Sequence, residues 1–272
     1  NYIDEDIHEF IREFKAFKAK HKHMTLKLIG FKEHYAIHNA IDVINVTAYD
    51  IQTALQPRAV FNILKEGNQR FLNDTRIHRS AKLDIQQTAV TQKPIAVVLG
   101  CIDSRVPVET IFDMSFGDLF CVRIAGNVVN DDILASIEYA CHVVGAKLIV
   151  ILGHTFCGAI QAACDGVEEG HLTNLLTKIQ PAIHAETQTT TQRNSKNIDF
   201  VYNVTQHNVA YTIHKIYEES ALLKEMIHED KLNIVGAVYN IQSGYVAFDD
   251  YAPLVSKLFP STVSQLQYKL CQ

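Results

Sequence analysis

The sequence lacks the features that mark several large classes of protein. Its longest apolar runs, residues 94–100 and 148–153, fall far short of the ~18 residues that cross a bilayer. It has no basic excess, with 25 Lys and Arg against 30 Asp and Glu and a net charge of −5, so no nucleic-acid partner is expected. Its six cysteines are too few for a disulfide scaffold in 272 residues. We therefore expect reduced thiols in a cytoplasmic compartment, available for a metal or for catalysis.

What is present is typical of a globular protein. Hydrophobic residues make up 47% and charged residues 20% of the chain, which excludes wholesale disorder. From Arg58 onward, apolar runs that predict strands alternate with helical spacing. Strands are expected at 95–99, 119–124, 148–152, 232–239 and near 245–248, and helices at 59–73, 107–112, 131–144, about 171–180 and 201–228. The alternation predicts an α/β fold with a mostly parallel central β-sheet flanked by helices.

Two groups of reactive side chains come directly after predicted buried strands. Cys101 is followed by Asp103 and Arg105, and His154 is followed by Cys157. Ligands bind at the carboxyl ends of parallel strands, so Cys101, His154 and Cys157 converge if the two strands are near neighbours. Two thiolates and one imidazole suit zinc, and three protein ligands leave its fourth position open. A closed structural site needs a fourth Cys or His nearby, and the spacing offers none. The pattern therefore favours a catalytic metal.

Asp103 and Arg105 are spaced to form a bidentate ion pair. Such a pair would hold Asp103 ionised and aim one of its oxygens at the metal. The alternative is an ordinary ion pair that braces a loop. Beside a metal, Asp103 could orient the nucleophile, or it could become a fourth ligand and close the site. The remaining cysteines are expected to be small apolar fillers or inert: Cys121, Cys141, Cys164 and Cys271.

The motifs Cys101-Ile-Asp-Ser-Arg-Val and His154-Thr-Phe-Cys-Gly-Ala resemble the two signature motifs of the β-class carbonic anhydrases. The resemblance extends through residues 64–71, 117–129 and 136–140, and it covers roughly residues 57–250. It implies zinc-dependent, reversible hydration of CO2 to bicarbonate and a proton. It also implies one Zn²⁺ per subunit on Cys101, His154 and Cys157, with Asp103 and Arg105 beside the metal. The family forms homodimers or tetramers, so the helix at 59–73 is expected to be an N-terminal helical arm that packs on a partner.

One further position matches the family, and a second candidate follows from the start of a helix. Gln92 lies nine residues before Cys101, where plant-like members carry a substrate-binding amide, although it could equally be an exposed turn residue. The backbone N–H of Gly158, at the start of a helix after Cys157, is a second candidate for binding the substrate anion. The bicarbonate-closed members carry a Trp in their extra bicarbonate pocket, and this chain has no Trp. Gln92 and the missing Trp therefore favour the type with an accessible site.

The beginning of the chain resembles a different family. Residues 2–14 and 26–31 are similar to the last helix and strand of a STAS domain, the cytoplasmic tail of SulP-type anion transporters. The expected organisation is a partial STAS-like segment at 1–35, a linker or arm at 36–56, the carbonic anhydrase domain at 57–250 and a C-terminal extension at 251–272. That organisation implies a fragment of a fusion between an inner-membrane transporter and a carbonic anhydrase. Two alternatives stay open: a low-turnover bicarbonate-binding regulatory module of the transporter, and a CS2 or COS hydrolase on the same fold.

Overall fold

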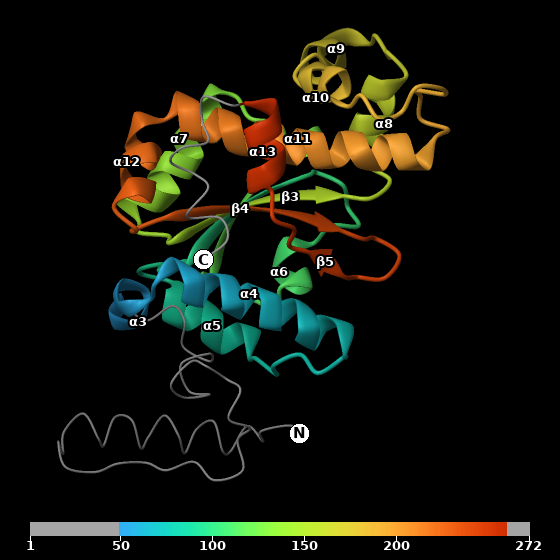
Figure 1. Cartoon of the computed structure of the whole chain (residues 1–272). Coiled ribbons are helices and arrows are strands. Elements are labelled where there is room, and N and C mark those ends of the chain that lie inside the picture. The colour runs from blue at the N-terminus through green and yellow to red at the C-terminus, as the bar shows by residue number, and fades with distance from the viewer. Residues whose placement is uncertain (1–48, 260–272) are drawn as a thin grey trace, which may run out of the picture.

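The structure, a computed structural model, describes residues 49–259 and is built around one five-stranded sheet (Figure 1). The strand order is β2-β1-β3-β4-β5. The first four strands in this order are mutually parallel, and β5 runs antiparallel to β4. The bounds are Ala96–Gly100 for β1, Leu119–Arg123 for β2, Leu148–His154 for β3, Asn233–Tyr239 for β4 and Val246–Ala247 for β5. The predicted α/β fold with a mostly parallel sheet is confirmed.

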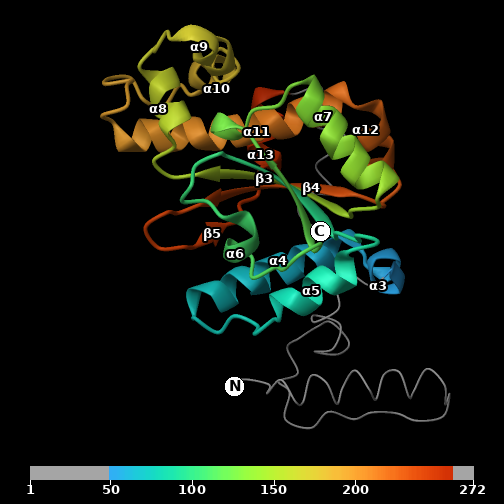
Figure 2. The ribbon, with the colours of Figure 1, turned by 180° about the vertical axis from the view of Figure 1, so that it is seen from behind.

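Helices cover both faces of this sheet (Figures 1 and 2). Because side chains alternate along a strand, Val97 and Leu99 enter one core while Ala96 and Val98 enter the other. On the first face lie α7 (Asp131–Glu138), the π-helix η2 (Tyr139–Val143), α11 (Ile198–Glu219), α12 (Ala221–His228) and α13 (Ala252–Leu258). On the other lie α3 (Tyr49–Ala54), α4 (Pro57–Leu72), α5 (Ala81–Thr88) and α6 (Val108–Ile111).

A third group of helices lies beyond the end of the sheet, against the first half of α11 (Figure 1). It consists of α8 (Gly158–Cys164), α9 (Gly170–Leu176) and α10 (Gln180–Ala185). Their apolar side chains form a separate small core with Cys101, Cys157 and Phe200. These helices cover one side of the sheet at the carboxyl ends of β1 and β3.

Two of the predicted helices are each split in the structure. The segment 201–228 is divided into α11 and α12 because Ser220 takes an extended conformation, and its hydroxyl accepts the N–H of Leu223 and donates to Glu138. The segment 171–180 ends early at Leu176, and Pro181 stands in the first turn of the new helix α10. A proline has no backbone N–H and suits the first turn of a helix, where that N–H needs no partner, so Pro181 fits the start of α10.

The α4 helix is part of the core of its own chain. Val60, Ile63 and Leu64 are at most 2% exposed and pack with the sheet. At Gly67 the helix passes so close to Phe112 that an added Cβ would lie 1.9 Å from the Phe112 carbonyl oxygen, so only glycine fits. If α4 also meets a partner subunit, as the resemblance implies, it must do so through its other side.

The described part of the predicted linker contains α3. The buried Gln52 side chain donates hydrogen bonds to the carbonyl oxygens of Pro94 and Val144, which ties this helix to the domain. The predicted STAS-like segment at 1–35, most of the linker and residues 260–272 lie outside the described residues. Within residues 49–259, no helix combines the length and the apolar character that a membrane span requires.

Candidate active site

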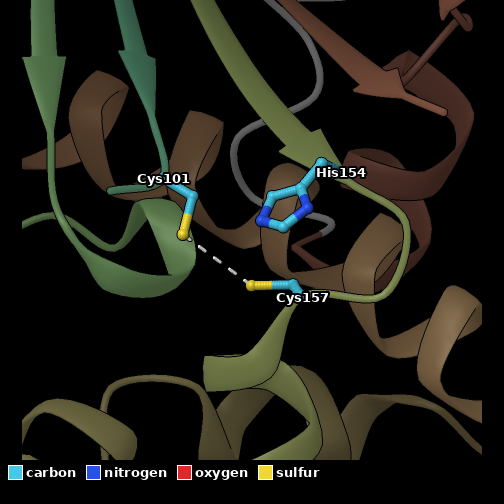
Figure 3. A group of neighbouring side chains, drawn as sticks. All are labelled: Cys101, His154 and Cys157. Carbon is cyan, nitrogen blue, oxygen red and sulfur yellow. Dashed lines mark hydrogen bonds between the residues drawn. The ribbon is translucent and has the colours of Figure 1, made fainter. Parts of the chain in front are cut away.

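Three potential metal ligands meet at the carboxyl ends of β1 and β3 (Figure 3). Cys101 directly follows β1, His154 is the last residue of β3, and Cys157 precedes the first residue of α8. Since β1 and β3 are paired in parallel, their ends lie side by side, which is the condition that the sequence pattern required. The Sγ atoms of Cys101 and Cys157 are 3.9 Å apart, and all the donor atoms lie within 4.8 Å of one another.

The donor set fits a zinc ion. Two sulfurs bound at about 2.3 Å to a tetrahedral zinc lie about 3.8 Å apart, close to the separation observed. The Nδ1 atom of His154 lies 3.0 Å from the Thr155 carbonyl oxygen, which assigns the ring proton to Nδ1 and leaves a lone pair on Nε2. That Nε2 is buried and has no hydrogen-bond partner among the described residues. A buried acceptor without a partner is costly, and a metal would satisfy it.

The two thiol sulfurs lie within hydrogen-bond distance of each other. The Cys157 thiol donates to the Cys101 sulfur, which lowers the pKa of Cys101, and the Gly126 N–H adds a 3.4 Å contact to the same atom. The pKa of Cys157 is correspondingly raised, first by this hydrogen bond and then by burial. Metal binding at this site releases protons, because cysteine binds a metal as the thiolate.

Asp103 lies beside the ligand cluster and is held by Arg105. The Arg105 backbone N–H and Nε each lie 2.9 Å from Asp103 Oδ1, and Nη2 lies 2.7 Å from Oδ2. The Arg105 hydrogen bonds lower the pKa of Asp103 to about 2. Asp103 Oδ2 is 4.0 Å from His154 Nε2, so the carboxylate borders the cluster of potential metal ligands. The predicted bidentate pair is present, and it faces the site.

The loop between His154 and Cys157 is conformationally strained. Phe156 has a φ of 55°, a left-handed conformation that is unfavourable for a bulky side chain. Its carbonyl oxygen accepts a hydrogen bond from Arg105 Nη2 at 3.3 Å. Arg105 therefore connects the loop that carries Asp103 with the loop that carries His154 and Cys157.

Gln92 and Gly158 are both exposed. Gln92 lies in the irregular segment between α5 and β1, and Gly158 is the first residue of α8. A Cβ added at Gly158 would meet nothing within 4 Å, so its backbone borders open space. The structure joins neither residue to the ligand cluster by a hydrogen bond within residues 49–259, and their contact with substrate stays a prediction.

The other described cysteines lie apart from the cluster. Burial is the largest cause of the raised pKa of each of these thiols. The pKa rises to about 12 for Cys164 and further for Cys121 and Cys141. Within residues 49–259, the only group of potential metal ligands is the one at 101, 154 and 157. Cys271 lies outside the described residues.

Two residues that support the site were not singled out from the sequence. Arg123, the last residue of β2, donates to the carbonyl oxygens of Cys101 and Asp103 at 2.9 and 2.6 Å. Gly126 donates its N–H to the Cys101 sulfur. Both contacts depend on the pairing of β2 with β1, which a linear motif does not reveal.

Comparison with known proteins gives a consistent assignment. The family model described as carbonic anhydrase matches residues 96–246. Carbonic anhydrase 2 of Mycobacterium tuberculosis is 35% identical over 201 residues, which cover 72% of this chain and 94% of that protein. The solved β-carbonic anhydrase CafA of Aspergillus fumigatus has a TM-score of 0.59 and 26% identity, over 76% of this chain and 97% of the other.

A structure described as one of two tetrameric β-carbonic anhydrases from Sordaria macrospora is similar as well. Its TM-score is 0.52 at 28% identity, and the match covers 62% of this chain and 90% of that one. The matched family region contains all three clustered ligands together with Asp103 and Arg105. The chain therefore belongs to the β-class carbonic anhydrase family and is an enzyme of that class.

Proposed function

We propose that this carbonic anhydrase binds one Zn²⁺ per chain through Cys101, His154 and Cys157 and hydrates CO2 reversibly at that ion. The observation that carries the proposal is the buried Nε2 of His154, which has no partner in the described chain and lies within 4.8 Å of two thiol sulfurs. When bound, zinc would supply Lewis-acid activation of a water molecule near neutral pH.

The residues of this chain supply orientation. Asp103 Oδ2 accepts one hydrogen bond from Arg105 and retains a lone pair, 4.0 Å from His154 Nε2. At this position it can accept a hydrogen bond from the attacking water. That hydrogen bond would orient a lone pair of the water oxygen toward CO2. The reaction consumes CO2 and water and yields bicarbonate and a proton, which leaves to the buffer. Gln92 and Gly158 are the proposed contacts for the substrate oxygens.

Arg105 favours an open site. It holds the Asp103 carboxylate through three hydrogen bonds, and moving Asp103 onto the metal as a fourth ligand would break at least part of this set. Each charge-assisted hydrogen bond is about twice as strong as a neutral one, which opposes that movement. We therefore expect the site to be accessible at neutral pH.

Stopped-flow CO2 hydration with zinc-loaded protein, at pH 7 and at pH 8.5, tests the proposal. Activity at both values is the expected result. Activity at pH 8.5 alone would mean that Asp103 closes the site at lower pH. Bound zinc without hydration at either pH, together with equilibrium binding of bicarbonate, would favour a regulatory bicarbonate-binding module instead.

We also propose that the chain assembles as a homodimer or a tetramer through the β2 edge of the sheet. Within residues 49–259, β2 has a partner strand on one side only. Exposed apolar side chains surround this edge: Phe116 is 52% exposed, Tyr139 51% and Val143 67%, and the Tyr139 ring packs edge-on to Phe120 of β2. A light-scattering mass equal to one chain would contradict this proposal.

The fusion with an anion transporter remains a proposal that rests on residues 1–35 alone. A carbonic anhydrase fixed on the cytoplasmic side of a bicarbonate pore would interconvert the transported ion with CO2 where it enters or leaves. Membrane fractionation of cells, with an antibody against the chain, tests it. Recovery of the full-length protein in the soluble fraction alone would contradict it.

A further inference from the structure

The ladder between β1 and β2 ends beside the proposed metal site. Its last backbone contact is the hydrogen bond from the Ile124 N–H to the Gly100 carbonyl oxygen, at 3.1 Å. Beyond it come the carbonyl groups of Cys101 and Asp103, which lie past the last paired residue of β1 within residues 49–259. The Asp103 carbonyl oxygen accepts the backbone N–H of Val106, and a carbonyl oxygen has two lone pairs, so each of the two groups can accept a hydrogen bond from a side chain as well.

The side chain of Arg123 donates hydrogen bonds to both of these carbonyl groups. Its Nε donates to the Cys101 carbonyl oxygen at 2.9 Å, and its Nη2 donates to the Asp103 carbonyl oxygen at 2.6 Å. A guanidinium presents donors in a rigid planar fork, whereas a lysine offers a single point of charge. The fork therefore fixes the distance between two carbonyl groups that flank Ile102, a residue that is itself 60% exposed and has little packing to hold it.

Asp103 is therefore held both at its backbone and at its side chain. Its carbonyl oxygen accepts from Arg123 and from the Val106 N–H at 3.0 Å, and its carboxylate accepts from Arg105. Arg105 sets the direction of the carboxylate, while Arg123 sets the position of the backbone from which it extends. The 4.0 Å separation between Asp103 Oδ2 and His154 Nε2 depends on both.

We propose that Arg123 is a positioning residue for Asp103, acting through the backbone of the Cys101–Asp103 turn. The proposal rests on the proposed hydration reaction for its effect on rate, and on the hydrogen bonds alone for its effect on the loop. Arg123 touches neither the ligand atoms nor the carboxylate. Its removal should disturb the placement of Asp103 more than it disturbs the metal, since Cys101 is also fixed by β1 and by the Gly126 N–H.

The test compares Arg123→Met and Arg123→Lys with the wild type and with Arg76→Met. Arg76 is a matched control because its side chain is half exposed and its ion-pair contact is a 3.8 Å one to Asp74, away from the site. For each protein we would measure zinc content, the unfolding temperature, kcat and KM for CO2 hydration, and amide hydrogen exchange. Exchange in the peptide spanning residues 101–106 would be followed with and without zinc.

In Arg123→Met we expect unchanged zinc content, exchange in this peptide about tenfold faster, and a kcat lower by about 10- to 100-fold with KM within about threefold. Arg123→Lys should recover part of both losses, and Arg76→Met should match the wild type. Unchanged exchange or unchanged kcat in Arg123→Met would overturn the proposal. Parallel loss of zinc and of folding would also overturn it, since Arg123 would then support the fold. If the wild type does not hydrate CO2, the proposed function fails, and the exchange data still decide whether Arg123 holds the turn.

Discussion

Replacing Arg105 with methionine separates two roles that its guanidinium could have at Asp103. The first role is to keep the carboxylate charged, because the Arg105 hydrogen bonds lower the pKa of Asp103 to about 2. The second role is to hold the carboxylate in one direction, through contacts of 2.7 and 2.9 Å from Nη2 and Nε. The two roles predict different pH profiles for the variant.

The pKa values decide which role matters. A carboxyl group with the ordinary value of 3.8 is about 0.1% protonated at pH 7, so Asp103 stays charged even without its partner. We therefore expect Arg105→Met to lose about 10- to 100-fold in kcat through lost orientation. Its pH profile from 6.5 to 8.5 should keep the shape of the wild-type profile. Arg105→Lys, which retains the charge without the planar fork, should be impaired as well.

Stopped-flow hydration across this pH range, with zinc content measured for each protein, provides the comparison. A new titration step that is present in the variant and absent from the wild type would refute the reasoning, because it would mean that Asp103 had begun to take up a proton. A kcat within twofold of the wild type would reduce the pair to the loop brace that the sequence also allowed.

The remaining predictions concern the metal, the carboxylate and one buried acid away from the site. His154→Ala should lose zinc and activity together, and full zinc occupancy measured by atomic absorption would contradict the ligand assignment. Asp103→Asn should keep its zinc and lose kcat, while an unchanged kcat would remove Asp103 from the reaction. Asp118 accepts the Ser115 N–H at 2.7 Å, and burial raises its pKa from 3.8 to about 6. Its charged form is disfavoured by folding, so the wild type should lose up to about 3 kcal/mol of stability as pH rises from 3.8 through 6. Asp118→Asn should lack that loss in urea unfolding at pH 4 and pH 8, and equal pH dependence in both proteins would contradict it.

The elements that the sequence predicted best are those with a strong local pattern. The strand at 148–152 and the helix starting at Asp131 follow from an unbroken apolar run and from two acidic residues in a first turn. The split of 201–228 was missed because the prediction followed apolar spacing alone, whereas the break is made by Ser220, which caps α12 through the Leu223 N–H and donates to the distant Glu138. Helical periodicity is the same on either side of such a break, so it cannot report it.

The candidate site divides in the same way. The ligand types and the Asp103–Arg105 spacing are local, and the structure brings them together as expected. The contribution of Arg123 is not local, because it depends on which strand neighbours β1, and the alternation of strands and helices does not fix the order β2-β1-β3-β4.

The position of the three clustered residues at the ends of two separate strands has a consequence for the biogenesis of the enzyme. Cys101 leaves the ribosome well before His154 and Cys157, and no complete binding site exists until β3 has paired with β1. Within residues 49–259, the apolar cores that cover the two faces of these strands include none of the three clustered residues, which lie at the sheet end. Folding can therefore precede loading, unlike in small zinc fingers, which are unfolded without their ion. A cell short of zinc should accumulate a folded, inactive reserve of this enzyme that later metal supply can activate without new synthesis.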